Sequence, residues 1–408
     1  MTHNPIAQTK IILGVTGSIA AYKAVDLASK LTQAGAGVNT ILTGAGAKFV
    51  SPLSFQSVTG QRAYTDDDLW SAQAHVLHVE LARHADVLLI APATANTMAK
   101  LAQGCADNLL CLTALAYEHP PLIAPAMDAG MFGHAATQEN LHVLQERGAI
   151  LIGPEAGHLA SGLSAKGRMT EPLEILGYVR YHLSRGGRLQ GRRVVVTAGG
   201  TQEPLDPIRF LGNRSSGRQG FALAQAALDA GADVSLISGP THLSAPVGVE
   251  CTRVRSAEEM KTATLQACQQ ADALLMAAAV ADFRPALTSS QKIKKGAGVP
   301  SIQLKANADI LAASTQLSKN IGHPKVLVGF AAESQDILSN ARAKLSSKGL
   351  DLIAANDIGA SDAGFAVDTN RVTLLHADGQ IEELPLMTKA EVAAEIIERV
   401  VALLVKGD

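Results

Sequence analysis

The sequence predicts an α/β protein with two three-layer domains, and three features of the chain support this. Apolar runs of strand length alternate with longer stretches of helical period, which is typical of parallel sheets covered by helices on both faces. Each half contains a strand, a glycine-rich loop and a helix in that order. The turn AGAGV at residues 34–38 returns as AGADV at residues 230–234. We therefore expect two Rossmann-like or flavodoxin-like domains with mainly parallel sheets.

Length and composition agree with this class and exclude others. A chain of 408 residues is long enough for two or three domains. With 35 Lys and Arg against 37 Asp and Glu, the net charge of −2 gives no basic field for nucleic acid. Aromatic residues make up only 3%, too few for stacking on single strands. The 47% hydrophobic content excludes disorder as the main state.

The cysteines and the amino terminus predict a compartment. Four cysteines without a CxxC pair suit neither a disulfide scaffold nor a zinc site. No signal-peptide core precedes the first strand, and apolar runs such as residues 273–281 are too short to span a bilayer. We expect a cytoplasmic protein that does not bind membranes.

Residues 184–193, SRGGRLQGRR, are rich in Gly and Arg and have no apolar period, so we interpret them as a linker. The predicted domains are residues 1–183 and 194–408. In the first domain we expect strands at residues 11–15, 38–42, 87–91, 122–126 and 149–152, with a helix at 137–147. In the second we expect strands at 194–198 and 233–238, a helix at 217–230, a hairpin turn at 377–380 and a closing helix at 389–405.

The first glycine loop is a candidate phosphate site. Gly17 and Ser18 follow a strand and precede a helix, so backbone N–H groups and the serine hydroxyl can meet a phosphate at the positive end of the helix dipole. A mononucleotide such as FMN needs less loop than a pyrophosphate. A tight turn without a ligand is the alternative. Thr43, after the second strand, either contacts the same ligand or caps a helix.

Two further loops, at residues 91–97 and 124–131, follow the third and fourth strands with small residues and few polar groups. The order GSIAAYK, HVELA, APATANT, ADNLL and PAMxxxM over most of residues 8–183 resembles the flavin-containing cysteine decarboxylases, which include the phosphopantothenoylcysteine decarboxylases. The resemblance implies bound FMN and an active-site histidine at His78, whereas His75 and His84 lack the motif context. FMN would carry the redox step, while the protein places the substrate and transfers protons.

The resemblance also implies further site residues. Those for the cofactor are Gly17, Ser18, Thr43, Ala93, Thr94, Asn96 and Thr97. Those for the substrate are Asn108, Met127 and Met131.

Two positions depart from that family's usual pattern. Asp128 stands where an asparagine is usual, and Ser161 stands where a lid cysteine often donates the final proton. Because an ionised Asp128 would repel a substrate carboxylate, we expect it to be protonated, turned away or bound to another group. A serine is a far weaker acid than a thiol, whose pKa is roughly 8.5. Either this is a subtype with another proton route or the flavin half has lost decarboxylation; the retained motifs favour the subtype. An ordinary loop serine is the other interpretation of Ser161.

The second half carries a cluster of anion-binding groups. Residues 213–220, NRSSGRQG, combine amide, hydroxyl and backbone donors at a helix start, which suits a phosphorylated acid better than a simple cap. The run KIKK at residues 292–295 is either a solvated charge patch or a cover for a triphosphate. Lys344 and Lys348, four residues apart, would also suit a solvated helix face.

Over nearly all of residues 191–405 the order of these motifs resembles the phosphopantothenate–cysteine ligases. The resemblance implies that 4′-phosphopantothenate attacks CTP to form an acyl-cytidylate, from which the amine of cysteine displaces CMP. Asn213 would act on the acyl-cytidylate and Lys292 would aid its formation. Ser215, Ser216 and Gly217 would bind substrate. The nucleotide would be lined by Met276, Ala277, Ala278, Asp282, Ala308, Asp309, Ile310, Leu311, Phe330, Lys344 and Lys348. The triphosphate should need Mg²⁺, whose ligands the sequence does not identify.

Both halves together resemble the bifunctional ligase and decarboxylase proteins of coenzyme A biosynthesis. That resemblance implies trimers of the flavin half and dimers of the ligase half, which together would build a dodecamer. Two alternatives stay open. One is an NAD(P) oxidoreductase fused to a flavoprotein, although no acidic residue stands at a ribose position after the second strand of either half. The other is an active ligase fused to a regulatory flavoprotein.

Overall fold

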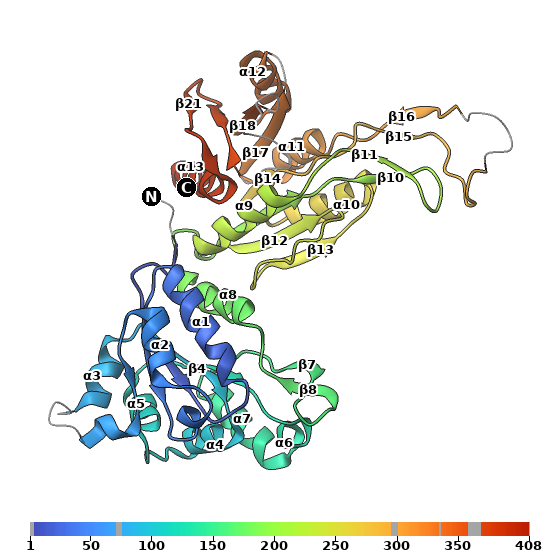
Figure 1. Ribbon diagram of the computed structural model, residues 1–408. Coiled ribbons are helices and arrows are strands. Elements are labelled where there is room, and N and C mark those ends of the chain that lie inside the picture. The colour runs from blue at the N-terminus through green and yellow to red at the C-terminus, as the bar shows by residue number, and fades with distance from the viewer. Residues whose placement is uncertain (1–3, 71–75, 295–300, 334–335, 358–368, 408) are drawn as a thin grey trace. The chain divides into compact units, whose positions relative to one another are not determined.

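The computed structural model describes residues 4–70, 76–294, 301–333, 336–357 and 369–407. The chain divides into two compact units, Asn4–Leu183 and a second that begins at Ser184 (Figure 1). Each unit is an α/β fold with a mainly parallel sheet, so the predicted fold class is confirmed. No helix within the described ranges is both long and apolar enough to cross a membrane.

The first unit is built on a six-stranded parallel sheet of order β3-β2-β1-β4-β5-β6. Its strands are β1 (Lys10–Val15), β2 (Gly37–Leu42), β3 (Ala63–Tyr64), β4 (Val87–Ala93), β5 (Leu122–Pro125) and β6 (Ile150–Leu151). The chain moves from β1 outward to one side and then returns to β4 on the other. The gap between β1 and β4 is therefore the switch point, where ligands of such sheets bind.

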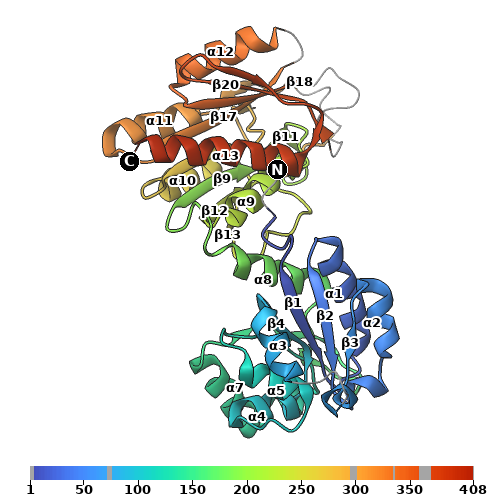
Figure 2. The ribbon, with the colours of Figure 1, turned by 90° about the vertical axis from the view of Figure 1, so that its left-hand side faces the viewer.

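Helices cover both faces of this sheet (Figure 2). One core contains Leu27 and Val179, from the helices α1 and α8, and the other contains Met98, Leu110 and Leu144, from α4, α5 and α7. The helices are α1 (Ala21–Gln33), α2 (Pro52–Thr59), α3 (Leu77–His84), α4 (Ala95–Gln103), α5 (Leu109–Ala116), α6 (Ala129–Gly133), α7 (Ala135–Glu146) and α8 (Pro172–Ser184). An antiparallel hairpin, β7 (Glu155–His158) and β8 (Ser164–Arg168), stands beside α6.

The second unit has an eight-stranded sheet of order β13-β12-β9-β14-β17-β18-β20-β21, in which only β20 and β21 run antiparallel to their neighbours. The strands are β9 (Arg193–Ala198), β12 (Asp233–Ser238), β13 (Glu250–Arg253), β14 (Ala273–Met276), β17 (Val326–Glu333), β18 (Leu352–Asp357), β20 (Val372–His376) and β21 (Ile381–Glu383). Its switch point lies between β9 and β14.

The helices of this unit are α9 (Arg218–Asp229), α10 (Ala257–Cys268), α11 (Ile310–Ile321), α12 (Ile337–Lys348) and α13 (Lys389–Gly407). Two-stranded ribbons complete it: β10 (Gln202–Pro204) with β11 (Phe210–Gly212), β15 (Phe283–Pro285) with β16 (Leu304–Ala306), and β19 (Thr369–Asn370) with β22 (Met387–Thr388). The first two ribbons extend outward from the sheet (Figure 1).

A glycine lets α9 pack closely on the central strand. A Cβ atom on Gly220 would lie 2.5 Å from the Cβ of Ala198, so no larger residue fits without a shift. Gly217, at the start of the helix, has a φ of 76°, which few other residues adopt. These two glycines bring the helix N-terminus to the end of β9.

The predicted hairpin at 377–380 and the closing helix from Lys389 are confirmed by β20–β21 and α13. Residues 184–193, which the sequence predicts as a hydrated linker, instead pack in part on the second unit. Ser184 ends α8, and the side chain of Leu189 is only 1% exposed. The Leu189 N–H donates to the Ala230 carbonyl at 2.6 Å. A single apolar residue among glycines and arginines gives no periodicity, which is why the pattern did not indicate packing.

Candidate functional site

The first unit has a cavity of about 540 Å³ at the carboxyl ends of β1, β4 and β5. It is bordered by the start of α1, the loop before α6 and the hairpin β7–β8. The structure brings together there seven of the residues predicted from the sequence: Gly17, Ser18, Thr94, Met127, Asp128, Met131 and Ser161.

One end of this cavity suits an anion. The helix α1 begins without a side-chain cap and with no acidic residue in its first turn, so its positive dipole end is uncompensated. The Ser18 hydroxyl accepts from the Ala20 N–H at 3.3 Å. The buried Thr16 hydroxyl donates to the Pro92 carbonyl at 2.7 Å and accepts from the Thr94 N–H at 3.0 Å, which joins the loops after β1 and β4.

The rest of the cavity is largely apolar, with Met127, Met131, Leu159 and Met169 among its lining residues. An apolar slot next to an uncapped helix N-terminus matches the two parts of a flavin mononucleotide, a flat ring system and a phosphate. The residues present therefore fit FMN.

The hairpin β7–β8 lies against the loop that follows β5. The Met127 N–H donates to the Gly167 carbonyl at 3.0 Å, and a Cβ on Gly167 would lie 2.3 Å from the Met127 oxygen. Only glycine allows this approach. At the tip, the Leu159 N–H donates to the Leu163 carbonyl at 2.8 Å, and Leu159 is 8% exposed. We call residues 159–163 the lid tip.

Asp128 and Ser161, the two departures from the family pattern, are in contact. The Ser161 hydroxyl donates to Asp128 Oδ2 at 2.6 Å, and Asp128 Oδ1 accepts from the Gly130 N–H at 2.9 Å at the start of α6. The Ser161 bond, followed by the Gly130 bond, lowers the pKa of the Asp128 carboxyl. Of the three alternatives for Asp128, these contacts favour an ionised carboxylate held by Ser161 and the start of α6 over a protonated one.

The remaining predicted residues of this unit are not among the described residues that line the cavity. His78 lies on α3, which packs against α5. The Thr43 hydroxyl accepts from the Gly46 N–H at 3.1 Å, and Asn108 caps α5 through the Cys111 N–H at 2.9 Å. Ala93 and Thr97 are buried, while Asn96 is exposed in the first turn of α4. His75 lies outside the described residues.

The second unit has a cavity of about 590 Å³ at the carboxyl ends of β9, β14, β17 and β18. The predicted residues that line it are Asn213, Ser215, Ser216, Gly217, Ala277, Ala278, Asp282, Phe330 and Lys344.

Hydrogen bonds join the loops after β9 and β14 at this switch point. Asn213 Nδ2 donates to the Val280 carbonyl at 2.9 Å, and the Ala279 N–H donates to the Gly199 carbonyl at 2.8 Å. The Thr201 hydroxyl accepts from the Ala281 N–H at 2.9 Å. The amide side chain of Asn213 is thus held at the mouth of the cavity.

The N-terminus of helix α9 and the ammonium group of Lys344 both bring positive charge to this second cavity. The helix α9 begins at Gly217 with no side-chain cap and no acidic residue in its first turn. Lys344 of α12 donates from Nζ to the Phe330 carbonyl at 2.7 Å, which holds its ammonium group at the cavity wall. The site therefore suits an anion such as a phosphate or a carboxylate.

Lys292 lies outside this cavity, in an exposed loop next to β15. Its neighbour Ile293 donates its N–H to Asp206 Oδ2 at 3.2 Å and accepts from Arg209 at 2.8 Å. Arg209 is also the main reason that the pKa of Asp206 lies far below its ordinary value. Lys295 lies outside the described residues.

Other nucleotide candidates also lie beyond the cavity lining. Met276, Ile310 and Leu311 are core residues, and Ala308 precedes α11. Asp309 pairs with Lys348 at 2.6 Å and caps α11 through the Ala312 N–H at 2.8 Å. Burial raises the pKa of Asp309, but these bonds outweigh it and the net shift is downward. The sequence analysis assigned these side chains to a nucleotide, whereas in this structure they pack in the core, cap α11 or form an ion pair.

The structure adds lining residues that sequence reasoning missed. In the first cavity they include Tyr22, Lys23, His158 and Arg168. In the second they include Asn356, Asn370 and Lys389, together with Gln219, which lies in the predicted cluster 213–220 but received no role of its own. The buried Oδ1 atoms of Asn356 and Asn370 have no hydrogen-bond partner among the described residues. Asn356 carried a usable signal, since the apolar run at 352–355 precedes it.

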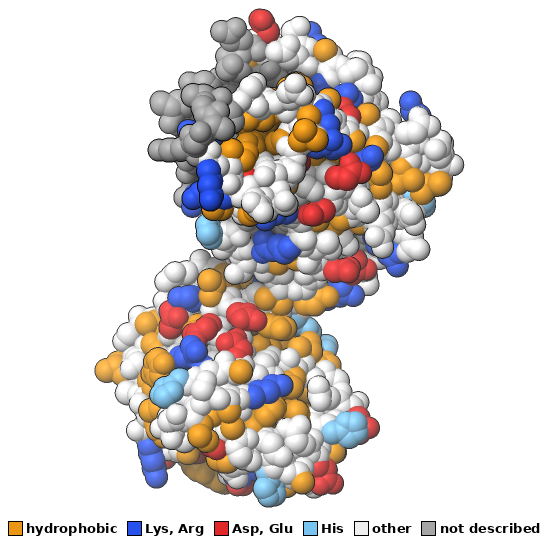
Figure 3. All heavy atoms as spheres, turned by 90° about the vertical axis from the view of Figure 1, so that its right-hand side faces the viewer, with side chains coloured by type: hydrophobic (Ala, Val, Ile, Leu, Met, Phe, Trp, Pro, Cys, Tyr) orange, Lys and Arg blue, Asp and Glu red, His pale blue; other side chains and the backbone are white. Residues whose placement is uncertain are grey.

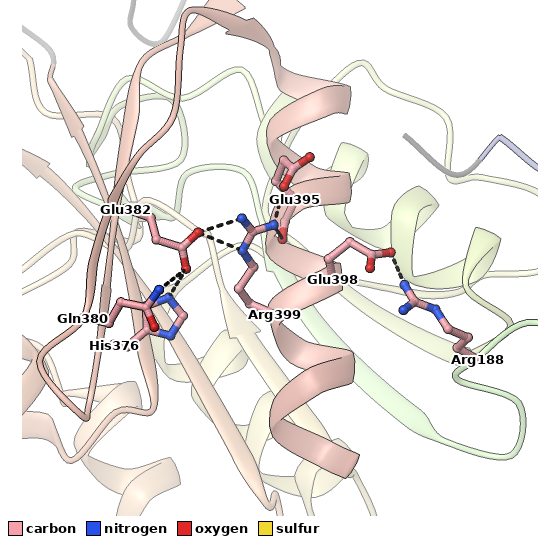
Figure 4. Close-up of polar contacts among 7 residues, drawn as sticks. All are labelled: Arg188, His376, Gln380, Glu382, Glu395, Glu398 and Arg399. Atoms are coloured by element: carbon pink, nitrogen blue, oxygen red, sulfur yellow. Dashed lines mark hydrogen bonds and ion pairs between the residues drawn. The ribbon is translucent and has the colours of Figure 1, made fainter. Parts of the chain in front are cut away.

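A third cavity, of about 530 Å³, lies at the opposite edge of the second sheet. There His376 Nε2 lies 2.7 Å from Glu382, which also pairs with Arg399 at 2.7 Å (Figure 4). Arg399 pairs with Glu395, and Glu398 with Arg188. Because these pairs join α13 to the β20–β21 hairpin and to the segment before β9, we assign the cluster a structural role. In the described part of the chain no group of three or more His, Cys, Asp and Glu residues is arranged to hold a metal.

Two cavities at the switch points of two successive sheets define a two-domain α/β enzyme, and comparisons with known proteins agree. The family "Flavoprotein" matches residues 2–184, and the family "DNA/pantothenate metabolism flavoprotein C-terminal domain" matches residues 189–404. The chain is 45% identical over 399 residues to the coenzyme A biosynthesis bifunctional protein CoaBC of Bacillus subtilis (strain 168), covering 96% of this chain and 97% of that protein. The chain belongs to this CoaBC family of bifunctional coenzyme A biosynthesis enzymes.

Solved structures match each half separately. The crystal structure of the C-terminal domain of a CoaBC protein is 38% identical, with a TM-score of 0.46, and covers 54% of this chain and 100% of its own. A cysteine-to-serine mutant of PPC decarboxylase, complexed with pantothenoylaminoethenethiol, is 36% identical, with a TM-score of 0.40, and covers 43% of this chain and 98% of its own.

Proposed function

We propose that this chain converts 4′-phosphopantothenate into 4′-phosphopantetheine in two steps. The second unit joins 4′-phosphopantothenate to cysteine with CTP, and the first decarboxylates the resulting 4′-phosphopantothenoylcysteine. The observation that carries the proposal is the pair of anion-accepting cavities, each at a switch point and each lined by residues that the motifs predict. The product of one site is the substrate of the other.

In the ligase step, Ser215, Ser216 and Gly217 bind the phosphorylated acid at the start of α9, where the helix dipole favours negative charge. The Asn213 amide stabilises the acyl-cytidylate. Lys344 neutralises the nucleotide phosphates, with Mg²⁺ carrying the rest of the charge compensation. Lys292 and the pair Asp309–Lys348 approach the nucleotide only if the segments that carry them move toward the cavity, since they do not line it here.

In the decarboxylation step, FMN supplies the two-electron oxidation and return reduction of the cysteine part of the substrate. Gly17, Ser18 and Thr94 hold its phosphate, and Met127, Met131 and Met169 pack around the ring. The lid tip excludes water from the reacting atoms. The cofactor loops are supported by residues that do not line the cavity: Thr43, Ala93, Asn96 and Thr97. Asn108 positions α5.

We assign His78 to the cavity of a neighbouring copy of the chain, because His78 is not among the described residues that line the cavity of its own unit. Large apolar side chains exposed on the same unit support self-association, among them Phe49 at 51%, Leu53 at 66% and Trp70 at 89% exposure. We propose trimers of the first unit and dimers of the second, which build a dodecamer.

The cytoplasm is the proposed location. All four cysteines are free, which suits a reducing compartment. On the face shown in Figure 3, positive and negative side chains are interspersed, so that face offers no basic field for nucleic acid.

The test separates the two halves. We expect the purified protein to be yellow and to release CO₂ from 4′-phosphopantothenoylcysteine. Asn213→Ala should abolish CTP-dependent amide formation and leave FMN content and CO₂ release unchanged. Asn320→Ala, on the exposed face of α11, is the matched control. Unchanged ligation in the Asn213 variant would reject the role of that residue, and a colourless, inert protein would reject the decarboxylase.

A further inference from the structure

Decarboxylation consumes one proton in each turnover. The bond between the carboxyl carbon and its neighbour breaks to release CO₂, and a new C–H bond takes its place. The redox chemistry is neutral overall, so the atoms balance only if one proton is delivered to the product. This chain lacks the lid cysteine that the family pattern implies for that delivery, so another group must provide the proton.

Ser161 is poorly suited to donate it. Its hydroxyl already donates to the Asp128 carboxylate at 2.6 Å. A hydrogen bond to an anion stabilises the protonated hydroxyl and makes serine an even weaker acid. Asp128 cannot replace it, because its contacts lower the pKa of its carboxyl and leave it ionised at neutral pH. The pair is therefore suited to hold the lid tip in place rather than to supply a proton.

The cationic groups around the cavity are engaged elsewhere. Lys23 Nζ lies 2.9 Å from Glu171, which also pairs with Arg168. Lys166 of β8 lies over the ring of Phe132 with its Nζ 5.4 Å from the centroid. These three side chains contribute positive charge near the hairpin, and their contacts with Glu171 and Phe132 engage them away from the reacting atoms.

His158 has the right chemistry and the right place. It is the last residue of β7, it lines the same cavity as Asp128 and Ser161, and its side chain is exposed. It precedes the lid tip directly. Imidazole is the side chain whose ordinary pKa permits proton donation and recovery near neutral pH. We propose that His158 delivers the proton that replaces the departing carboxylate, with Ser161 and Asp128 as positioning residues for the lid tip.

The proposal rests on the proposed decarboxylase function and assigns its proton route. The other titratable or charged groups that face this cavity are Tyr22 and Lys23 from α1, Asp128 before α6 and Arg168 from β8. At the base of the hairpin, Glu155 lies by Glu174 of α8, whose pKa is raised by burial and then by Glu155. Besides Ser161, Tyr22, which is 63% exposed, is a rival donor among the described lining residues.

The test compares His158→Gln with His142→Gln, a control on α7 whose imidazole pairs with Glu146 away from the cavity. We expect the His158 variant to release CO₂ in a first turnover. It should form 4′-phosphopantetheine about 100-fold more slowly or worse. A thiol two hydrogens short of the product should accumulate while the flavin colour stays bleached. The pH dependence of product formation should also differ between the wild type and the variant.

A binding readout is independent of turnover. Adding 4′-phosphopantetheine should shift the NMR signals of the His158 ring and leave those of His142 unchanged. Full product formation with the wild-type pH profile in His158→Gln would overturn the proposal, as would the same defect in Tyr22→Phe instead. A wild-type protein that releases no CO₂ would reject the decarboxylase function itself, and the proton route with it.

Discussion

Ser161 donates a 2.6 Å hydrogen bond to Asp128, so the two residues that depart from the decarboxylase pattern form one contact. One belongs to the lid tip and the other begins α6. In this chain the two positions therefore form a contact that ties the lid tip to the start of α6. This relationship favours an active subtype over a decayed flavin site.

Breaking this contact should loosen the lid. We expect Ser161→Ala to raise the KM for 4′-phosphopantothenoylcysteine by up to about fivefold, because exposed contacts of this kind contribute little. FMN content should stay at the wild-type level. Ser57→Ala, on α2, is the control. Loss of all product formation at unchanged KM would instead identify Ser161 as a proton donor.

The close packing at Gly220 gives a stability prediction. Gly220→Val should lower the free energy of unfolding of the second unit by about 2 kcal/mol or more, because its Cβ would overlap β9 and overpacking is costly. Gly186→Val is the control, since a Cβ at Gly186 has no neighbour within 4 Å. Urea denaturation measures both. Equal stability of the two variants would mean that α9 shifts away from β9 freely.

The Glu382–Arg399 pair gives a pH prediction. Arg399 is the main cause that lowers the pKa of Glu382 from its ordinary value of 4.5. A depressed carboxyl pKa stabilises the fold above its ordinary value, and this stabilisation is lost as pH falls through the folded-state pKa. Arg399→Met should therefore cost about 1–2 kcal/mol at neutral pH, and less below pH 4.5.

Urea denaturation of the Arg399 variant at several pH values measures this effect. Combining the change with Glu382→Gln in a double-mutant cycle isolates the pair. A loss of stability that does not depend on pH would show that Arg399 acts through packing of its aliphatic chain.

The two lysines of α12 should differ in effect. Lys344→Met should raise the KM for CTP about tenfold, because it removes an ammonium group from the cavity wall. Lys348→Met should have a smaller effect, since Asp309 holds that ammonium at 2.6 Å. Steady-state kinetics with CTP varied will separate them, with Lys319→Met as the control. Equal effects would indicate that Asp309 releases Lys348 when the nucleotide binds.

The sequence predicts best what depends on local pattern. The glycine loops, the loops after the strands and the helix starts at Ala21 and Arg218 follow from apolar periodicity and turn chemistry. The loops that carry Thr94 and Met127 were expected at the carboxyl ends of strands, which share one edge of a parallel sheet, and both residues line the first cavity.

What the sequence does not predict depends on contacts between distant segments. Asp128 and Ser161 are 33 residues apart, and nothing in either motif indicates that they touch. The pairing of Asp309 with Lys348 spans 39 residues. His158 belongs to no motif and is identified only by the cavity it lines. A role for a single residue can therefore be proposed only from the structure, whereas the fold class and the positions of the cavities can be predicted from the sequence.

The central claim, that one chain carries out both steps, is tested most directly by incubating the wild-type protein with 4′-phosphopantothenate, cysteine, CTP and Mg²⁺. CMP, CO₂ and 4′-phosphopantetheine should be measured separately in the same sample. The account predicts that all three form and approach equal amounts at completion. CMP without CO₂, with 4′-phosphopantothenoylcysteine as the final product, would contradict it.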